Sequence, residues 1–314
     1  MNILIAGGAG FIGSNLTNYH LKKKDHVFVI DNLITGSQKN IESFFPNTNF
    51  HFIEDDITKL NFSSLPGFDI IYHLASPASP VQYKKYPIET LLTNSIGTHN
   101  LLEFFKKSNS KSLVIASTSE VYGDPLIHPQ TENYWGNVNP VGIRACYDEG
   151  KRFSEAISTT YFRKYNLNIR IARIFNTYGP NMEKEDGRVV SNFIYQALTN
   201  KPITIYGKGT QTRSFCYVSD MTKALYLLAT TPNIRGEIIN LGNPSEKSIL
   251  ELANIVKNLA NSKSSIVFRP IDEDDPRQRK PDITKAKTKL NWEPKIPLKE
   301  GLLKTMEYFK KRFI

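Results

Sequence analysis

Short apolar runs alternate with amphipathic segments along the first half of the chain. The runs are rich in Val and Ile and nearly continuous in hydrophobicity, which is typical of strands buried on both faces of a parallel sheet. The segments between several of them have helix length, and this alternation favours right-handed crossovers in a doubly wound sheet. We predict strands at residues 2–6, 26–31, 49–53, 69–74, 111–117 and 168–174, and helices at 11–23, about 87–107 and about 145–165.

The alternation of strand-like and helix-like segments becomes irregular after about residue 175, where Gly- and Pro-rich turns such as NTYGPN, YGKGTQ and NLGNPS interrupt it. Further helices are predicted near 219–230, 248–260 and 297–312. The predicted fold class is α/β, a doubly wound parallel sheet of the Rossmann type with a smaller C-terminal α/β substrate subdomain. We assign residues 1–175 to the first domain and 176–314 to the second, and expect 214–241 to return to the first.

Length and composition narrow the class of protein. A chain of 314 residues with 40% apolar content can bury a sizeable core. No stretch approaches the roughly 20 apolar residues of a membrane span, and MNILIAGGAGFIG lacks the basic start of a secretory signal. A cytoplasmic protein without a membrane partner is therefore expected. The two cysteines and six histidines show no ligand spacing, so neither a metal site nor a disulfide is expected.

The net charge of +10 raises the question of an anionic partner. Nucleic-acid surfaces gather Lys and Arg on one face. Here the lysines form scattered pairs and triplets, as in KKK at 22–24 and KK at 106–107, where helices should face water. Solvated faces explain most of the charge, and attraction of a small anionic substrate explains the remainder. No nucleic-acid partner is expected.

A glycine turn follows the first predicted strand. Gly7, Gly10 and Gly13 form GxxGxxG between a strand and a helix, where glycines let backbone N–H groups approach a pyrophosphate. The second strand ends at Asp31, 18 residues after Gly13, where a carboxylate can accept from an adenosine ribose 2′-hydroxyl and would repel a 2′-phosphate. The pattern predicts NAD rather than NADP. The alternative is a turn that only packs the helix.

Tyr147 and Lys151 are candidates for acid–base chemistry. Residues four apart share a helix face, and a nearby ammonium lowers the pKa of a tyrosine, which makes it usable as a base. The same spacing occurs at Tyr19 and Lys23, which we interpret as a surface pair at the outer end of the first helix. Tyr147 differs because its helix follows the strand that ends at Thr118, and catalytic groups gather at the carboxyl ends of parallel strands.

Seven stretches together carry a family resemblance over nearly the whole chain: GGAGFIG, STSEVYGD, NVNPVGIRACYDEGKR, RIFNTYGP, GRVVSNFI, YGKGTQTRSFCYVSD and DPRQRKPDI. The chain resembles the UDP-glucuronate decarboxylases, or UDP-xylose synthases, of the extended short-chain dehydrogenase/reductase family. The resemblance implies tightly bound NAD, oxidation at C4 of UDP-glucuronate, loss of carbon dioxide and re-reduction to UDP-xylose. It also implies a homodimer formed through the helices at about 87–107 and 145–165.

The resemblance explains the polar cluster after the fifth strand. Related 4,6-dehydratases have Thr-Asp-Glu there, and the Asp protonates a leaving hydroxyl. Ser119 takes that position here, and a serine is a poor proton donor. The implied catalytic residues are Thr118, Ser119, Glu120, Tyr147, Lys151 and Arg279. Arg279 would meet the substrate carboxylate, with Arg277 as its near competitor; a surface ion pair within 272–279 is the alternative interpretation of Arg279.

The binding residues follow from the same resemblance. For the cofactor they are Gly7, Gly10, Phe11, Ile12, Gly13, Asp31, Asn32, Thr35, Gly36, Asp56, Ile57, Leu74, Ser76, Tyr147 and Lys151. For the substrate they are Tyr83, Asn176, Arg188, Val190, Tyr206, Gln211, Arg213 and Arg277, with Ser76 and Pro77 as further sugar contacts. Arg213 would meet the diphosphate, unless it forms only a salt bridge at a strand edge. Tyr83 lies in ASPASPVQY, where the family more often has SPPNYM.

Three other functions share parts of this pattern. A sugar-nucleotide 4-epimerase or a 4,6-dehydratase begins with the same oxidation at C4, and Ser119 with Arg279 counts against both. A non-catalytic protein that binds NAD or a UDP-sugar would have the same fold, since fold does not fix function. The combination of Thr118, Tyr147 and Lys151 argues for catalysis.

Overall fold

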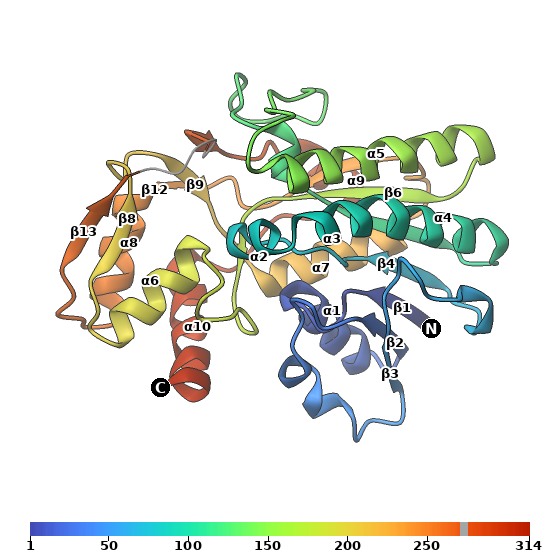
Figure 1. Cartoon of the computed structure of the whole chain (residues 1–314), viewed down its shortest axis with the longest axis horizontal. Helices are drawn as coiled ribbons and strands as arrows, with labels where there is room; N and C mark the ends of the chain where they lie inside the picture. The colour runs from blue at the N-terminus through green and yellow to red at the C-terminus, as the bar shows by residue number, and fades with distance from the viewer. Residues whose placement is uncertain (271–275) are drawn as a thin grey trace.

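The computed structural model describes residues 1–270 and 276–314. Its centre is a seven-stranded parallel sheet in the order β11-β6-β5-β4-β1-β2-β3, which confirms the predicted doubly wound fold (Figure 1). The six strands predicted in the first half form within one or two residues of their expected ends. They are β1 (Asn2–Ala6), β2 (His26–Asp31), β3 (Phe50–Glu54), β4 (Ile70–His73), β5 (Ser112–Thr118) and β6 (Ile169–Ile174), joined by β11 (Ile238–Leu241).

Helices cover both faces of this sheet. Apolar side chains of α1 (Phe11–Lys22) and α7 (Val218–Thr230) join the core on one face. On the other face, α4 (Thr98–Lys107) and α5 (Ala145–Tyr165) pack against it. The helix predicted at 87–107 is one run of α3 (Pro87–Leu92), a π-helical turn η4 (Thr93–Gly97) and α4.

β5 and α5 carry the candidate chemistry, and their sequences explain their form. All seven residues of β5 are buried, as the apolar run predicts for a central strand. α5 is capped at its C-terminal end by Asn166, whose φ of 53° is left-handed, a conformation that asparagine tolerates better than most residues. Since α5 starts near the carboxyl end of β5, its first turns lie at the sheet edge where parallel-sheet enzymes bind ligands.

A second apolar core lies beside the sheet, within the C-terminal part of the chain (Figure 1). Helices α6 (Val189–Leu198), α8 (Ile249–Leu259) and α10 (Leu298–Phe313) build it, and α8 begins with a capping box between Ser248 and Glu251. The division at residue 175 stays a prediction. Several residues after it, among them Leu225, Leu241 and Leu290, belong to the first core. The remaining elements after residue 175, of which α9 packs on the first core, are α9 (Thr284–Leu290), β7 (Thr177–Tyr178), β8 (Ile203–Tyr206), β9 (Thr212–Ser214), β10 (Cys216–Tyr217), β12 (Glu246–Ser248), β13 (Ile266–Arg269) and β14 (Gln278–Arg279).

Several short elements had no prediction from the sequence. Strands of two to four residues show too little alternation to be recognised, and they form because partners distant in sequence pair with them. The unpredicted helical elements of the first half are α2 (Pro80–Lys85), η1 (Gln38–Asn40), η2 (Glu42–Phe44), η3 (Phe62–Ser64) and η5 (Ser119–Tyr122). Both cysteines are free. None of the described helices combines the length and apolar character that crossing a membrane requires.

Candidate active site

The glycine turn between β1 and α1 has no room for a side chain at Gly7 or Gly13. Gly7 has a φ of +84°, and a Cβ there would lie 2.5 Å from the backbone N of Ala75. A Cβ on Gly13 would lie 2.1 Å from the carbonyl oxygen of Gly7. α1 begins at Phe11, so the first N–H groups of the helix, which lack intrahelical acceptors, point to the cleft that Gly7, Gly10, Phe11, Ile12 and Gly13 line. This geometry fits a pyrophosphate.

Asp31 closes a recess next to the glycine turn. Its two carboxylate oxygens accept the backbone N–H groups of Ala9 and Leu33, each at 2.9 Å. Burial raises the pKa of Asp31 above its ordinary value. A Cβ on Gly36 would lie 2.7 Å from Asp31, so the loop packs directly on the carboxylate. The recess is lined by eight of the residues predicted to bind the cofactor: Asp31, Asn32, Thr35, Gly36, Asp56, Ile57, Leu74 and Ser76. The residues present therefore fit NAD.

Asp31→Asn is expected to weaken NAD binding about 10- to 100-fold, because a hydrogen bond to a charged acceptor contributes about 1.5–3 kcal/mol. Titration calorimetry on protein stripped of nucleotide measures this affinity. Glu54→Gln is the matched control, since Glu54 pairs with Asp31 on the neighbouring strand but is exposed. An unchanged NAD affinity in Asp31→Asn would contradict the assignment.

Tyr147, Thr118 and Lys151 meet where β5 ends. Tyr147 is buried in the first turn of α5, and Thr118 hydrogen-bonds its hydroxyl. Lys151, one turn later, donates to the carbonyl oxygen of Ala116 at 2.9 Å, and its Nζ lies 5.9 Å from the Tyr147 ring centre. All three predicted residues line the same cleft of about 810 Å³.

The expected direction of the Tyr147 pKa is wrong for this structure. Burial raises the pKa of Tyr147 to about 12, although the hydrogen bond from Thr118 opposes the shift. Burial also lowers the pKa of Lys151 to about 7. The spacing correctly predicts two neighbours on one helix face, but in a dry site desolvation of each side chain outweighs their mutual effect. A further positive charge is needed before Tyr147 can act as a base near neutral pH.

Glu120 lies between two guanidinium groups. Arg144 pairs with one carboxylate oxygen and Arg279 with the other. Burial alone would raise the pKa of Glu120, but the charges of Arg144 and Arg279 outweigh it and lower this pKa. Arg279 is 1% exposed and also donates to the carbonyl oxygen of Gly123 at 2.9 Å. Its Nη1 lies 3.5 Å from Ser119 Oγ, so the predicted carboxylate-binding arginine stands beside the predicted serine.

The other end of the cleft contains the residues predicted to hold the UDP portion. Arg213 is buried and donates to the carbonyl oxygens of Thr212 and Pro276, at 2.9 and 2.6 Å. Arg188 lies 3.1 Å from the carboxylate of Asp186. The structure brings all six predicted residues of this end to the cleft: Asn176, Arg188, Val190, Tyr206, Gln211 and Arg213.

Two predicted substrate residues lie elsewhere. Tyr83 is buried beneath Tyr147, with the rings stacked 5.1 Å apart at 7°, and does not line the cleft. The side chain of Arg277 is 77% exposed and does not line the cleft. Its backbone N and its Nε donate hydrogen bonds to the carboxylate of Asp124. The structure therefore favours Arg279 over Arg277. The surface-pair interpretation of Arg279 is wrong, because its partner is Glu120; residues 271–275 of that stretch lie outside the described residues.

Sequence reasoning missed Arg144 and Asp148. Arg144 precedes the first residue of α5 and lines the cleft, and Asp148 lies 3.7 Å from it. Burial and the charge of Glu120 raise the pKa of Asp148. One signal was available: a cation at a helix N-terminus opposes the helix dipole, so Arg144 breaks a local preference.

Comparison with known proteins assigns the family. The family model described as GDP-mannose 4,6 dehydratase matches residues 4–305. UDP-glucuronic acid decarboxylase 3 of Arabidopsis thaliana is 53% identical over 313 residues, which cover 99% of this chain and 90% of that protein. UDP-glucuronic acid decarboxylase 1 of Danio rerio is 52% identical over 307 residues, covering 98% and 72%. This chain belongs to the UDP-glucuronic acid decarboxylase family.

Solved structures of related enzymes share the fold of this decarboxylase family member. UDP-glucuronic acid 4-epimerase of Bacillus cereus, in complex with UDP-glucuronic acid and NAD, superposes with a TM-score of 0.92 at 32% identity, covering all of both chains. A dTDP-glucose 4,6-dehydratase of Streptomyces venezuelae, with NAD bound, has a TM-score of 0.91 at 26% identity, covering 99% of this chain and 98% of that one. Epimerase, dehydratase and decarboxylase therefore differ in side chains within one framework.

Proposed function

We propose that this protein converts UDP-glucuronate to UDP-xylose and carbon dioxide, using bound NAD. One observation carries the proposal: buried Arg279 stands beside Ser119 and Glu120, at the strand end where Tyr147 meets Thr118. An arginine there suits a sugar carboxylate, and a serine there leaves water elimination without its acid. The relatives with about half of their residues identical support the same reaction.

The residues that would hold the cofactor are those of the glycine turn and the recess around Asp31, with Lys151 toward the nicotinamide ribose. When bound, NAD supplies a reversible two-electron oxidant for C4 and a positive ring charge. Such a charge favours the phenolate and so opposes the effect of burial on the Tyr147 pKa. The side chains of this protein supply the remaining steps.

Tyr147 accepts the proton of the C4 hydroxyl as C4 is oxidised to a ketone. The carboxylate on C5 is then β to a carbonyl group. When carbon dioxide leaves, the electrons of the broken C–C bond move onto the C4 oxygen, where Thr118 and Tyr147 can donate hydrogen bonds. C5 then takes up a proton, for which Glu120 orders a water, and C4 is reduced again. The balance is UDP-glucuronate plus one proton giving UDP-xylose and carbon dioxide.

The direct test is incubation of the protein, reconstituted with NAD, with UDP-glucuronate and mass spectrometry of the product pool. We expect carbon dioxide and UDP-xylose in equal amounts. Epimerisation at C4 with the carboxylate retained would contradict the proposal; this is the rival to consider, because the Bacillus cereus epimerase was solved with UDP-glucuronic acid. Binding of the sugar nucleotide without turnover would indicate a non-catalytic protein.

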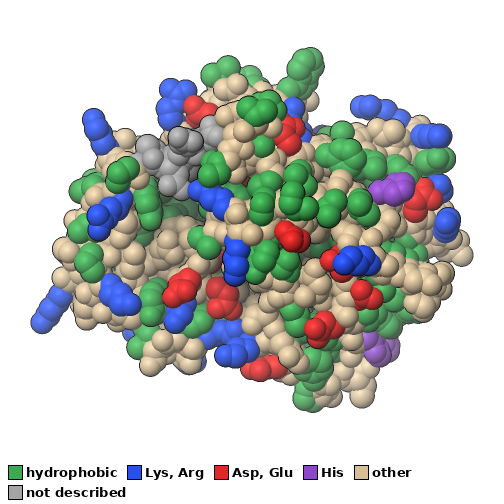
Figure 2. Space-filling model, viewed as in Figure 1, with side chains coloured by type: hydrophobic (Ala, Val, Ile, Leu, Met, Phe, Trp, Pro, Cys, Tyr) green, Lys and Arg blue, Asp and Glu red, His purple; other side chains and the backbone are tan. Residues whose placement is uncertain are grey.

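We also propose that the protein is a cytoplasmic homodimer. Exposed apolar side chains gather over α3, η4 and α5, where the family resemblance places the interface, and hydrophobic side chains are dense on this face (Figure 2). They include Ile88, Leu92, Ile96 and Phe153. The two free cysteines are compatible with a reducing compartment. Sedimentation equilibrium of the wild type and of Leu92→Glu tests the dimer.

A further inference from the structure

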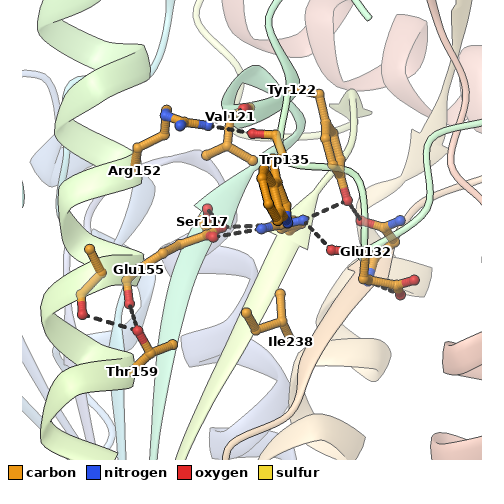
Figure 3. A network of polar contacts seen from close by, with 12 residues as sticks. Ser117, Val121, Tyr122, Glu132, Trp135, Arg152, Glu155, Thr159 and Ile238 are labelled. Carbon is orange, nitrogen blue, oxygen red and sulfur yellow. Dashed lines mark hydrogen bonds and ion pairs between the residues drawn. The ribbon is translucent and has the colours of Figure 1, made fainter. Parts of the chain in front are cut away.

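A buried ion pair lies behind the active-site strand, outside the cleft. Glu155 of α5 and Arg173 of β6 are each 8% exposed. Arg173 donates from Nε and Nη2 to the two oxygens of Glu155, at 2.9 and 2.8 Å, and Ser117 donates to Glu155 at 2.5 Å. Figure 3 shows Glu155 reaching from the helix to Ser117. A buried ion pair is weak evidence for a role in stability, because the desolvation of its charges can offset their attraction.

The geometry of this pair fixes the helix that carries the candidate base. Glu155 is one turn beyond Lys151 and two turns beyond Tyr147, so the three side chains share one face of α5. A two-bond contact between a guanidinium and a carboxylate restricts both distance and orientation. Through Ser117 and Arg173, Glu155 joins α5 to two adjacent strands, β5 and β6, directly behind Thr118. The pair therefore sets where Tyr147 stands relative to Thr118.

The remaining donor group of Arg173, Nη1, contacts residues other than Glu155. Nη1 donates to the hydroxyl of Tyr122 at 2.9 Å and to the carbonyl oxygen of Glu132 at 3.0 Å. Tyr122 in turn donates to Asn240 Oδ1 at 2.8 Å. These contacts hold the loop that follows Glu120 against the sheet.

Asn240 continues the network to the segment that carries Arg279. Its Nδ2 donates to the carbonyl oxygens of Gln130 and Asp282, at 3.0 and 3.2 Å. The backbone N of Gln130 donates to the carbonyl oxygen of Lys280 at 2.9 Å. Contacts on this side therefore reach the backbone immediately after Arg279, through the buried side chains of Tyr122, Asn240 and Gln130.

We propose that Arg173 is a positioning residue for both halves of the reaction. Through Glu155 it places Tyr147 and Lys151 for oxidation at C4. Through Tyr122 and Asn240 it places Arg279 for loss of the carboxylate. The inference rests on the proposed function. It predicts that breaking the branch through Glu155 slows oxidation at C4, and that breaking the branch through Tyr122 and Asn240 slows decarboxylation.

Two isosteric variants separate the branches. Glu155→Gln weakens the contact with α5, and Tyr122→Phe removes only the hydroxyl. We expect turnover to fall about 10- to 100-fold in Glu155→Gln, since displacements near 1 Å have such effects. The isotope effect from deuterium at C4 should then rise. In Tyr122→Phe the carbon-13 isotope effect at the carboxylate should rise instead, with the C4 effect reduced.

Arg170→Met provides the matched control. Arg170 is also buried on β6, but it bonds to Asn168 and to the carbonyl oxygen of Leu228, away from the cleft. Arg170→Met should lower the melting temperature of the protein without changing either isotope effect. Arg173→Met should change both isotope effects. If Arg173→Met does not fold, Arg173→Lys takes its place in the test, with the same expected result. If Glu155→Gln and Tyr122→Phe lose only stability, as Arg170→Met does, the inference is wrong while the proposed function stands. A wild type that releases no carbon dioxide from UDP-glucuronate overturns both.

Discussion

Tyr147→Phe is expected to lower turnover of UDP-glucuronate by roughly 10²- to 10⁴-fold, the usual contribution of a positioned proton acceptor. Only the hydroxyl is lost, and the ring keeps its stacking on Tyr83. Burial raises the pKa of Tyr147 to about 12 and the charge of bound NAD opposes this shift, so the wild-type rate should rise with pH until the phenolate predominates. That alkaline rise should be absent in the variant. Stopped assays of UDP-xylose across pH 6–10 measure both effects.

Tyr19→Phe is the matched control for this experiment, because Tyr19 and Lys23 repeat the Tyr-x-x-x-Lys spacing. Lys23 lies 5.7 Å from the Tyr19 ring at the outer end of α1, and neither residue lines the cleft. We expect the turnover of Tyr19→Phe to stay within about twofold of the wild type, because Tyr19 is half-buried against Tyr226 and lies outside the cleft. If Tyr147→Phe matched Tyr19→Phe, Tyr147 would have no part in proton transfer.

The first half of the fold could be predicted because its signals are local. A Val- and Ile-rich run followed by GxxGxxG specifies strand, turn and helix without reference to distant residues. The same holds for Asp31, whose position at the end of β2 follows from chain spacing. The short strands around β9 could not be predicted, because each exists only through pairing with residues far along the chain.

The candidate site was predictable in its residue types and less so in their arrangement. Arg277 and Arg279 are two residues apart, and only the contacts of Asp124 and Glu120 decide which one faces the cleft. The partner of Arg144 is Glu120, 24 residues away, so its position depends on how α5 docks. Spacing identified Tyr147 as a neighbour of Lys151, but the depth of burial that sets both pKa values is a property of the folded protein.

Lys151→Met should abolish activity and yet stabilise the protein against urea. Burial lowers the pKa of Lys151 from 10.5 to about 7, so the unfolded chain binds this proton more tightly than the native protein does. Below pH 7 the lysine is charged in both states and its full desolvation cost opposes folding; above 10.5 it is neutral in both and the cost disappears. Wild-type stability therefore gains from this group as pH rises through that window. The variant should be more stable by about 4 kcal/mol below pH 7, after about 1 kcal/mol is subtracted for the bond to Ala116.

Urea unfolding at pH 6, 8 and 10 measures this difference, which should shrink steadily with pH. His73 contributes little, because burial and the charge of Lys151 lower its pKa to about 3 and it stays neutral throughout. Lys23→Met is the control, since Lys23 is exposed and its removal should give a small difference that does not vary with pH. A stability gain in Lys151→Met that is the same at all three pH values would mean that Lys151 is hydrated in the native state. Its ammonium would then be present at neutral pH beside Tyr147, and the need for an additional positive charge to ionise that tyrosine would disappear.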